Sequence, residues 1–335
     1  MVSISLSKGT RLAIPGIVLL ILAVYILSSL LKASTPTVPE WLPSHVRTAL
    51  AANSSASIED EYLKLPARRA PKHAIFSSVQ TARFSQYAMM LAYSLQKYND
   101  LAALDAELVL LVRTEGADGV TPQNITRLER VGWTIVVERD LDFENVDESK
   151  IRSHHRHNLN KLYLWSYTQY ERIVFIDADT LCKGQIGELF QQPGEIAGTP
   201  DVWWDILTDT RFNSGVITFR PSIEEFHNMI KAVSDPKMHK PNDADQAFLN
   251  AYYRFRFNAL PYKYNFNLVM YQFHRGTWDK LWDEAVIVHF TMKKPMPTRH
   301  CRKGCNEWEP SEWYSMVCKE MLAFYGYEKE LPVLG

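Results

Sequence analysis

The sequence predicts an α/β fold in which a mostly parallel sheet carries helices on both faces. Short apolar runs, typical of buried strands, alternate along the chain with longer segments whose apolar residues recur at helical spacing. This alternation is typical of parallel sheets, because parallel neighbours need long crossover connections that are usually helices. The composition, 46% hydrophobic and 22% charged over 335 residues, agrees with a globular protein that has a large core.

The expected elements follow one another closely from residue 74 onward. The helix after the first strand has Ala88, Leu91 and Leu95 on one face. Strands are expected over residues 74–78, 107–112, 133–137 and 172–176, and helices over 85–98, 122–131 and 158–170. Ligands of such sheets bind beyond the carboxyl ends of the strands, so the residues directly after each strand are the first candidates for a site.

The N-terminal region predicts a membrane anchor. Residues 12–31 contain no charge, and a helix of that length spans ~30 Å, which is one hydrocarbon thickness. Lys8 and Arg11 precede the run and only Lys32 follows closely, which favours a cytosolic N-terminus. A cleaved signal peptide is the alternative, but the run is long for one. We expect a cytosolic tail over 1–11, a single-pass signal anchor over 12–31, a proline-containing stem over 32–70 and a globular domain over 71–335.

Two further features agree with a lumenal domain. Triplets that accept N-glycans begin at Asn53 and Asn124. Three of the four cysteines, Cys301, Cys305 and Cys318, lie near the C-terminus, and an oxidising lumen would favour a disulfide among them, although the sequence does not choose the pairing. A zinc site formed by His300 and these cysteines is disfavoured, because the spacing matches no common zinc pattern. The net charge of −1 gives no support to a nucleic-acid partner.

Two aspartates, Asp177 and Asp179, directly follow the predicted strand 172–176. An Asp-x-Asp triplet alone is a weak signal, because aspartate is common in turns and helix caps. Its place at the end of a buried strand is more specific. Carboxylate oxygens suit magnesium or manganese, which proteins commonly bind with one or two carboxylates together with substrate phosphates. The position therefore predicts a site for such a cation.

The chain resembles glycosyltransferase family 8, the glycogenin-like enzymes, in several segments that occur in the family's order. They are LNKLYLWSYTQY (159–170), RIVFIDADTLCKGQIGELF (172–190), RFNSGVITFRPS (211–222), DADQAFLNAYY (243–253), LPYKYNFN (260–267) and VIVHFTMKKPM (286–296). The resemblance covers about residues 73–296. It implies a Rossmann-like nucleotide-sugar transferase fold of the GT-A type, with residues 71–335 as the catalytic domain.

The resemblance also implies roles for individual residues. Asp177, Asp179 and His289 match the family's metal ligands, for which Mn²⁺ is the expected ion. The residues matched to the UDP-sugar donor are Lys161 near the donor, Lys294 at the diphosphate, and Ser78, Gln80, Thr81 and Phe84, which hold the positions that receive the uridine and ribose although their residue types differ. Those matched to the transferred sugar are Asp201, Asn213, Asp245 and Gln246, with Asp245 beside the anomeric carbon.

Some positions depart from the family pattern. Met292 stands where the family usually has glycine in the diphosphate loop, and Met296 where it has tryptophan. Asn242 replaces an aspartate of glycogenin, which puts glucose as the transferred sugar in doubt. We also expect the small Gly215 to let the backbone approach the ligand closely.

The implied function is that of a manganese-dependent, retaining glycosyltransferase. It would move a hexosyl or N-acetylhexosaminyl unit from a UDP-sugar to a glycan or glycoprotein acceptor, as a type II protein of the Golgi or another secretory-pathway membrane. Two alternatives stay open. One is a catalytically inactive family member that binds nucleotide sugars or serves as a scaffold, and the other is a GDP-mannose transferase, which the ordered segments disfavour. The sequence identifies neither the sugar nor the acceptor.

Overall fold

The structure is a computed structural model that describes residues 71–141, 143, 157–203, 210–238, 240, 244–292, 294–295 and 309–328. The chain divides into two compact units, residues 1–69 and 70–335, and every described residue belongs to the second. The expected anchor over 12–31 and the stem therefore lie outside the described residues, as do Asn242, Met296 and Cys301. Among the described helices, none has the length and apolar character needed to cross a membrane.

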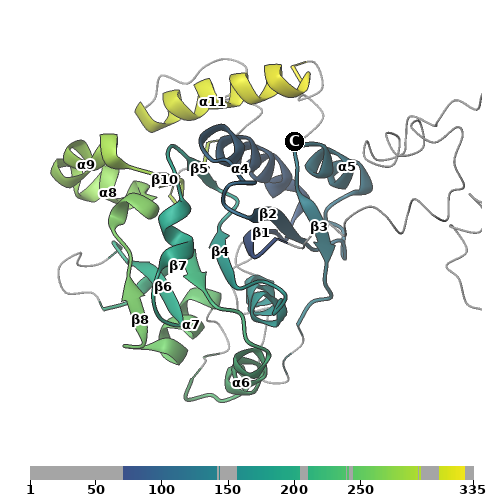
Figure 1. Cartoon of the computed structure of the whole chain (residues 1–335), viewed down its shortest axis with the longest axis vertical. Helices are drawn as coiled ribbons and strands as arrows, with labels where there is room; N and C mark the ends of the chain where they lie inside the picture. The colour runs from purple at the N-terminus through teal and green to yellow at the C-terminus, as the bar shows by residue number, and fades with distance from the viewer. Residues whose placement is uncertain are drawn as a thin grey trace, which may run out of the picture. The chain divides into compact units, whose positions relative to one another are not determined.

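A seven-stranded sheet forms the centre of the second unit (Figure 1). Its strand order is β3-β2-β1-β4-β7-β6-β8. The strands are β1 (His73–Val79), β2 (Ala106–Val112), β3 (Thr134–Val137), β4 (Arg172–Ile176), β6 (Ile196–Pro200), β7 (Phe212–Phe219) and β8 (Phe257–Ala259). All neighbouring pairs are parallel except the two that β7 makes with β4 and β6. The expected mostly parallel α/β sheet is confirmed.

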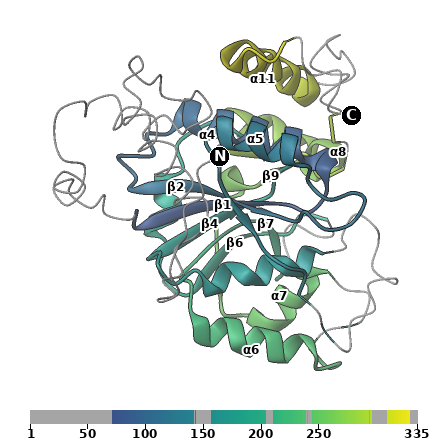
Figure 2. The ribbon, with the colours of Figure 1, turned by 90° about the vertical axis from the view of Figure 1, so that its right-hand side faces the viewer.

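Helices cover both faces of this sheet, as Figure 2 shows. On one face lie α4 (Ser85–Tyr98) and α5 (Pro122–Arg130), with α11 (Glu309–Tyr325) packed on α4; on the other lie η4 (Asn158–Ser166), α6 (Ile223–Val233) and α7 (Asp245–Tyr253). Side chains of β1 alternate between two apolar cores: Ile75 and Val79 enter the first, Ala74 and Phe76 the second. Both cores are needed because a parallel sheet is buried on both sides.

One expected helix differs from the structure. Residues 158–166 form a 3₁₀ helix instead of an α-helix that continues to residue 170. The amide of Asn160 bonds the carbonyl of His157, three residues back. Its side chain accepts a hydrogen bond from the amide of Leu141 (2.9 Å) and donates one to Asp140 (2.7 Å). Asparagine side chains that bond outside the helix compete with regular α-helical geometry, and long 3₁₀ segments often mark functional positions.

A smaller sheet, with the order β5-β10-β9, lies beside the carboxyl end of β4. It consists of β5 (Thr180–Cys182), β10 (Ile287–His289) and β9 (Phe266–Asn267). The register pairs His289 with Thr180 on one side and with Asn267 on the other. The remaining elements are η1 (Ala82–Phe84), η5 (Gly187–Gln191), η6 (Tyr262–Tyr264), α8 (Leu268–Phe273), α9 (Arg275–Leu281) and η7 (Trp282–Glu284).

The topology marks one edge of the central sheet as the place for a ligand. From β1 the chain runs to β2 on one side and later returns to β4 on the other, so the strand order switches between β1 and β4. Open α/β sheets bind ligands at such a switch, outside the carboxyl ends of the strands. The segment after β4 contains Asp177 and Asp179, and the segment after β1 contains Gln80 and Thr81.

The described cysteines differ in state. Cys182 is a buried free thiol, whereas Cys318 on α11 is disulfide-bonded, with a partner outside the described residues. A disulfide in this part of the chain agrees with the expectation, and its pairing lies outside the described residues.

Candidate active site

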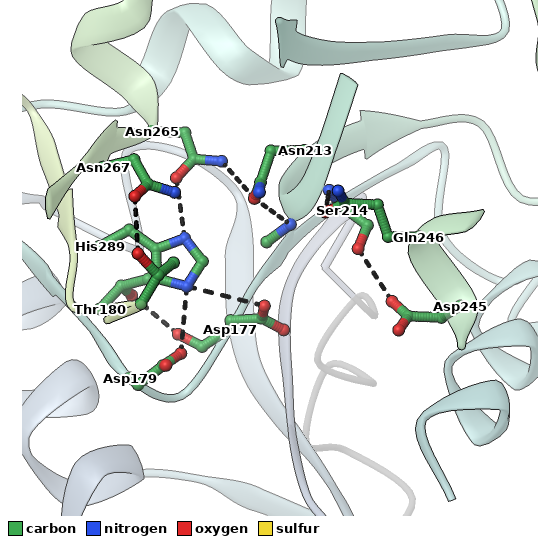
Figure 3. A network of polar contacts seen from close by, with 12 residues as sticks. Asp177, Asp179, Thr180, Asn213, Ser214, Asp245, Gln246, Asn265, Asn267 and His289 are labelled. Atoms are coloured by element: carbon green, nitrogen blue, oxygen red, sulfur yellow. Dashed lines mark hydrogen bonds and ion pairs between the residues drawn. The ribbon is translucent and has the colours of Figure 1, made fainter. Parts of the chain in front are cut away.

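The structure brings Asp177, Asp179 and His289 together at the carboxyl end of β4 (Figure 3). Their ligand atoms all lie within 4.8 Å of one another. His289 Nε2 is 3.2 Å from Asp179 Oδ1 and 3.9 Å from Asp177 Oδ2. Asp179 and His289 are buried and Asp177 is half-buried. We call these residues the three-ligand cluster.

The tautomer of His289 is fixed by a neighbouring amide. Its Nδ1 lies 2.9 Å from Asn265 Oδ1 and donates to it, while Asn265 Nδ2 donates to Asn213 Oδ1 at 2.9 Å. When a metal is bound, Nε2 would then face the two carboxylates with its lone pair. Three acceptors that converge on one point fit a bound cation, and carboxylate and imidazole are ligands that manganese accepts. An outer partner on the second ring nitrogen is typical of metal-ligating histidines.

Gly215 on β7 makes room for this imidazole. A Cβ atom at position 215 would meet His289 Cε1 at 2.3 Å and Nδ1 at 2.7 Å, which is closer than real contacts allow. The missing side chain of Gly215 therefore leaves space for the ring of His289, a role that the sequence did not indicate; the expected close approach of a ligand stays a prediction. Its amide also donates to Asn213 Oδ1 at 3.0 Å.

Two lysines engage the carboxylate oxygens that face away from His289. Lys161 on η4 lies 3.5 Å from Asp177 Oδ1, and Lys294 donates to Asp179 Oδ2. Lys161 also donates to Asp245 Oδ2 at 2.5 Å, and both of these side chains are about 95% buried, with 5% exposed in each. Burial lowers the pKa of Lys161, but Asp177 and Asp245 outweigh it and raise that pKa above its usual value. Lys161 therefore stays charged inside the protein.

The two aspartates of the cluster differ in their electrostatics. Burial raises the pKa of Asp179, but Lys294 and His289 outweigh burial and hold that pKa well below its usual range. Burial raises the pKa of Asp177 most, and the charge of Asp179 adds to the rise; Lys161 and His289 act in the opposite direction without offsetting burial. The ionised form of Asp177 is therefore the less favourable of the two in the protein alone, and a bound cation would stabilise it.

A second group of polar side chains, the β7–α7 cluster, lies beside the three-ligand cluster, as Figure 3 shows for Ser214, Asp245 and Gln246. It consists of Asp201, Asn213, Ser214, Asp245 and Gln246, of which four are buried and Gln246 is half-buried. Gln246 donates to Asp201 Oδ2 at 2.9 Å and accepts from the amide of Ser214 at 3.1 Å. Ser214 Oγ donates to Asp245 Oδ2 at 2.9 Å, and Asn213 Nδ2 lies 3.4 Å from Asp201 Oδ1.

Comparisons with known proteins agree with this geometry. Residues 57–202 match the family model described as glycosyl transferase family 8. Glycogenin-1 from Mus musculus is 33% identical over 137 residues, which cover 39% of this chain and 39% of that protein. The matched part of the chain, residues 57–202, is a glycosyl transferase family 8 domain.

A second curated relative and a solved structure are also similar to this chain. A putative UDP-glucuronate:xylan alpha-glucuronosyltransferase 5 from Arabidopsis thaliana is 33% identical over 137 residues, which cover 41% of this chain and 22% of that protein. The matched segment thus spans about two fifths or less of the curated relatives' length. A solved galactosyltransferase, LgtC with donor and acceptor sugar analogs, is similar with a TM-score of 0.54 at 14% identity, over 74% of this chain and 95% of that chain. At that identity the likeness concerns the fold, and it agrees with the expected GT-A type.

In this family 8 domain, the residues after β1 lie next to both parts of the site. Gln80 Oε1 accepts from Asn160 Nδ2 at 3.3 Å, one residue before Lys161. The ring of Phe84 lies 5.9 Å from Lys294 Nζ. Thr81 Oγ1 is buried without a partner among the described residues, and Ser78 is half-buried at the end of β1. These four residues lie at the end of β1 or in the segment that follows it, on the β1 side of the switch point, where the family resemblance predicts that the uridine and ribose bind.

Met292 stands where the family usually has glycine, so the position of its side chain decides whether it obstructs the expected diphosphate loop. Its side chain is partly buried and packs against the apolar core around α4 and α11. A hydrogen bond also holds the loop in place: the hydroxyl of Tyr87 on α4 donates to the carbonyl of Pro295 at 2.8 Å. Burial is the main cause that raises the pKa of Tyr87 to about 12, so it remains a donor at neutral pH.

Several residues that shape the site were not expected. Asn265 orients His289, Ser214 holds Asp245, and Asn267 accepts from Thr291 Oγ1 at 2.6 Å and thereby steadies the segment before Lys294. A signal was present in the segment Asn265-Phe266-Asn267, because two asparagines at i and i+2 share one face of an extended chain. Two asparagines that flank a buried aromatic residue in this way indicate a polar face that makes specific hydrogen bonds.

Proposed function

We propose that this protein is a manganese-dependent, retaining glycosyltransferase that moves a hexosyl or N-acetylhexosaminyl unit from a UDP-sugar to a glycan or glycoprotein acceptor. The observation that carries the proposal is the three-ligand cluster, whose ligands lie within 4.8 Å of one another at the carboxyl end of β4. It lies at the topological switch point, with charged lysines on both sides. Fold and family membership agree with a nucleotide-sugar donor.

The diphosphate of the donor is proposed to bind at the three-ligand cluster. Asp177, Asp179 and His289 would hold the metal, and a bound manganese ion would act as a Lewis acid that neutralises charge on the leaving UDP. Lys294, which is partly exposed, would add a positive point charge at the same diphosphate. Tyr87 and Asn267 keep the segment that carries Lys294 in place.

The transferred sugar is proposed to bind at the β7–α7 cluster. Asp201, Asn213 and Gln246 hold one another by hydrogen bonds, so their remaining polar atoms are preorganised for sugar hydroxyls. Asp245 Oδ2 receives hydrogen bonds from Lys161 and Ser214. A carboxylate oxygen with two such donors is a weakened nucleophile, and we assign Asp245 to the stabilisation of positive charge at the anomeric carbon.

Retention follows from this assignment. An inverting enzyme needs a general base on the face opposite the leaving group, whereas in a retaining enzyme the leaving phosphate can accept the proton. The Arabidopsis thaliana relative is named an alpha-glucuronosyltransferase, which agrees with α-linked products. Proton NMR of the first product would test this point: we expect an α linkage from an α-linked donor, and a β linkage would overturn the proposal.

The inactive alternative rests on Met292 and Met296. Met292 packs against the apolar core; we propose that it thereby leaves space for the diphosphate, which favours an enzyme. A screen of UDP-sugars for slow hydrolysis, with Mn²⁺ and with chelator, tests the proposed activity. Metal-dependent release of UDP from one donor supports it. Binding of UDP without hydrolysis of any donor would instead support a binding or scaffold protein.

A location in the Golgi or another secretory-pathway membrane is part of the proposal. It is supported by the uncharged run over residues 12–31 and the basic residues before it. Protease treatment of intact microsomes that contain a C-terminally tagged chain tests it. The tag should survive without detergent and be digested with detergent, and digestion in both conditions would rule out a lumenal domain.

A further inference from the structure

A cavity lies at the end of the central sheet opposite the three-ligand cluster. It has a volume of about 370 Å³ and is lined by His73, Glu171, Arg172, Phe190 and Arg220. Arg172 is the first residue of β4, whereas Asp177 follows its last residue. At ~3.3 Å per strand residue the two positions are ~16 Å apart. The cavity is therefore distinct from the three-ligand cluster.

Arg172 carries a buried charge without a described counter-charge. The residue is 4% exposed. Its Nη2 donates to the carbonyl of Gly194 at 3.3 Å, and its Nη1 is buried with no hydrogen-bond partner among the described residues. Burial, and then the charge of Arg220, lower the pKa of Arg172. A buried cation of this kind is costly unless an anion or further acceptors balance it.

The carboxylate in the cavity wall does not supply this balance. Glu171 is exposed and lies 3.4 Å from Lys72 Nζ, and no ion pair joins it to Arg172 in the described part of the chain. Arg220, just after the end of β7, is a second arginine among the lining residues, and its charge acts on Arg172. On another side, the rings of His73 and Phe190 stack with centroids 4.7 Å apart. The cavity thus combines two arginines with an apolar, aromatic wall.

We propose that this cavity binds a phosphate group between the guanidinium groups of Arg172 and Arg220. Planar guanidinium groups match the geometry of phosphate oxygens and form paired, charge-assisted hydrogen bonds with them. The volume lies near the lower end of the range for small-molecule sites, so it admits free phosphate or a small phosphorylated molecule such as a sugar phosphate. The proposal does not depend on glycosyl transfer, because it uses none of the residues at the carboxyl end of the sheet.

Titration calorimetry with the full-length chain tests this proposal. Inorganic phosphate is titrated at constant ionic strength in the presence of chelator, so that no metal in the three-ligand cluster contributes. We expect one saturable site, at least tenfold weaker in Arg220→Gln and unchanged in Arg275→Gln. Arg220 is exposed, so its variant should fold, and Arg275 on α9 is a matched exposed arginine whose described partners are Asp279 and Glu309.

The outcomes separate this site from the proposed active site. No saturable binding at millimolar phosphate, or equal affinity in the wild type and Arg220→Gln, would overturn the proposal. Loss of phosphate binding in Asp179→Asn with retention in Arg220→Gln would also overturn it, because the phosphate would then occupy the three-ligand cluster. UDP binding with Mn²⁺ should be unchanged in Arg220→Gln. A parallel titration with glucose 6-phosphate distinguishes the sources: tighter binding than that of phosphate indicates a sugar phosphate, and weaker binding indicates free phosphate.

Discussion

The three-ligand cluster and the β7–α7 cluster lie side by side but are stabilised differently (Figure 3). In the first, acceptor atoms of Asp177, Asp179 and His289 converge, and their charge is offset from outside by lysines. In the second, amide, hydroxyl and carboxylate groups satisfy one another by hydrogen bonds. Lys161 joins the two, with Nζ 3.5 Å from Asp177 Oδ1 and 2.5 Å from Asp245 Oδ2.

This difference separates ligand binding from stability. Converging acceptors store electrostatic repulsion that a bound cation relieves, so Asp177, whose ionised form the folded state disfavours, should matter mainly for the ligand. A buried, mutually bonded cluster contributes to folding, so its residues should matter for stability as well as turnover. The raised pKa of Asp177 is an example of the first kind of cluster, and the buried, hydrogen-bonded Asp245 is an example of the second.

The largest expected effect is loss of a metal ligand. Asp177→Asn, Asp179→Asn and His289→Ala should each lower transfer activity by about two orders of magnitude or more, because each removes a group that stabilises charge on the leaving diphosphate. Asp177→Asn should not lower the melting temperature of the metal-free protein, since the folded state disfavours the ionised form of Asp177. Initial rates and thermal melts check both points. Full activity in excess chelator would refute the metal role.

The next effect concerns Asp245 in the β7–α7 cluster. Asp245→Asn should reduce kcat by about 100-fold, because the transition state loses a charge, while UDP affinity in Mn²⁺ changes little. Lys161 would also lose its closest buried partner, so we expect a loss of about 3 kcal/mol in the free energy of unfolding. Denaturant unfolding and steady-state kinetics measure the two.

Ser214→Ala is the matched control for Asp245→Asn. It removes one hydrogen bond to the same oxygen, Asp245 Oδ2, and should cost about 1 kcal/mol. If Asp245→Asn were as stable as the wild type, the contrast between the two clusters would be wrong.

A smaller effect is expected from the residues that orient His289. Gly215→Ala places a Cβ atom 2.3 Å from His289 Cε1, and Asn265→Ala removes the acceptor of His289 Nδ1. Each should weaken Mn²⁺ binding by about 10–100-fold, as for other outer partners of ligating histidines. Gly276→Ala is the control glycine, because a Cβ there meets nothing within 4 Å. Equal Mn²⁺ affinity of Gly215→Ala and Gly276→Ala, measured by electron paramagnetic resonance, would contradict this account.

The smallest effect is expected from Tyr87, which holds the segment that carries Lys294 in place. Tyr87→Phe removes the hydrogen bond to the carbonyl of Pro295 and should cost about 1 kcal/mol at neutral pH. The folded-state pKa of Tyr87 is raised from 10.0 to about 12. The folded state thus favours the protonated phenol, and its contribution is complete below pH 10 and lost as the pH rises toward 12. The difference in stability between wild type and Tyr87→Phe should therefore shrink over that range, and a constant difference would count against this role.

Much of the central sheet could be predicted because its strands are continuous apolar runs. The expected strand 172–176 and helix 85–98 agree with β4 and α4. The sheet β5-β10-β9 could not be predicted, since strands of two or three residues show no periodicity. Residues 158–166 have helical spacing, and the choice of a 3₁₀ helix depends on contacts of Asn160 with residues distant in sequence.

The site divides in the same way. Asp177 and Asp179 could be singled out from their place after a strand, but His289 came from the family resemblance alone. Its approach to the aspartates depends on the pairing of β10 with β5. The roles of Asn265 and Gly215 depend on three-dimensional contacts that no local pattern contains. The sequence therefore predicted the residues next to a strand end, whereas the residues that orient His289 could be identified only from the structure.

The most direct test of the central claim is the affinity of UDP for the full-length chain with and without metal. Titration calorimetry would compare Mn²⁺ with excess chelator, in the wild type and in Asp179→Asn. The account predicts that UDP binds the wild type at least tenfold more tightly in Mn²⁺, and that Asp179→Asn removes this difference. The same UDP affinity in Mn²⁺ and in chelator would contradict the claim that Asp177, Asp179 and His289 hold a metal for a nucleotide-sugar donor.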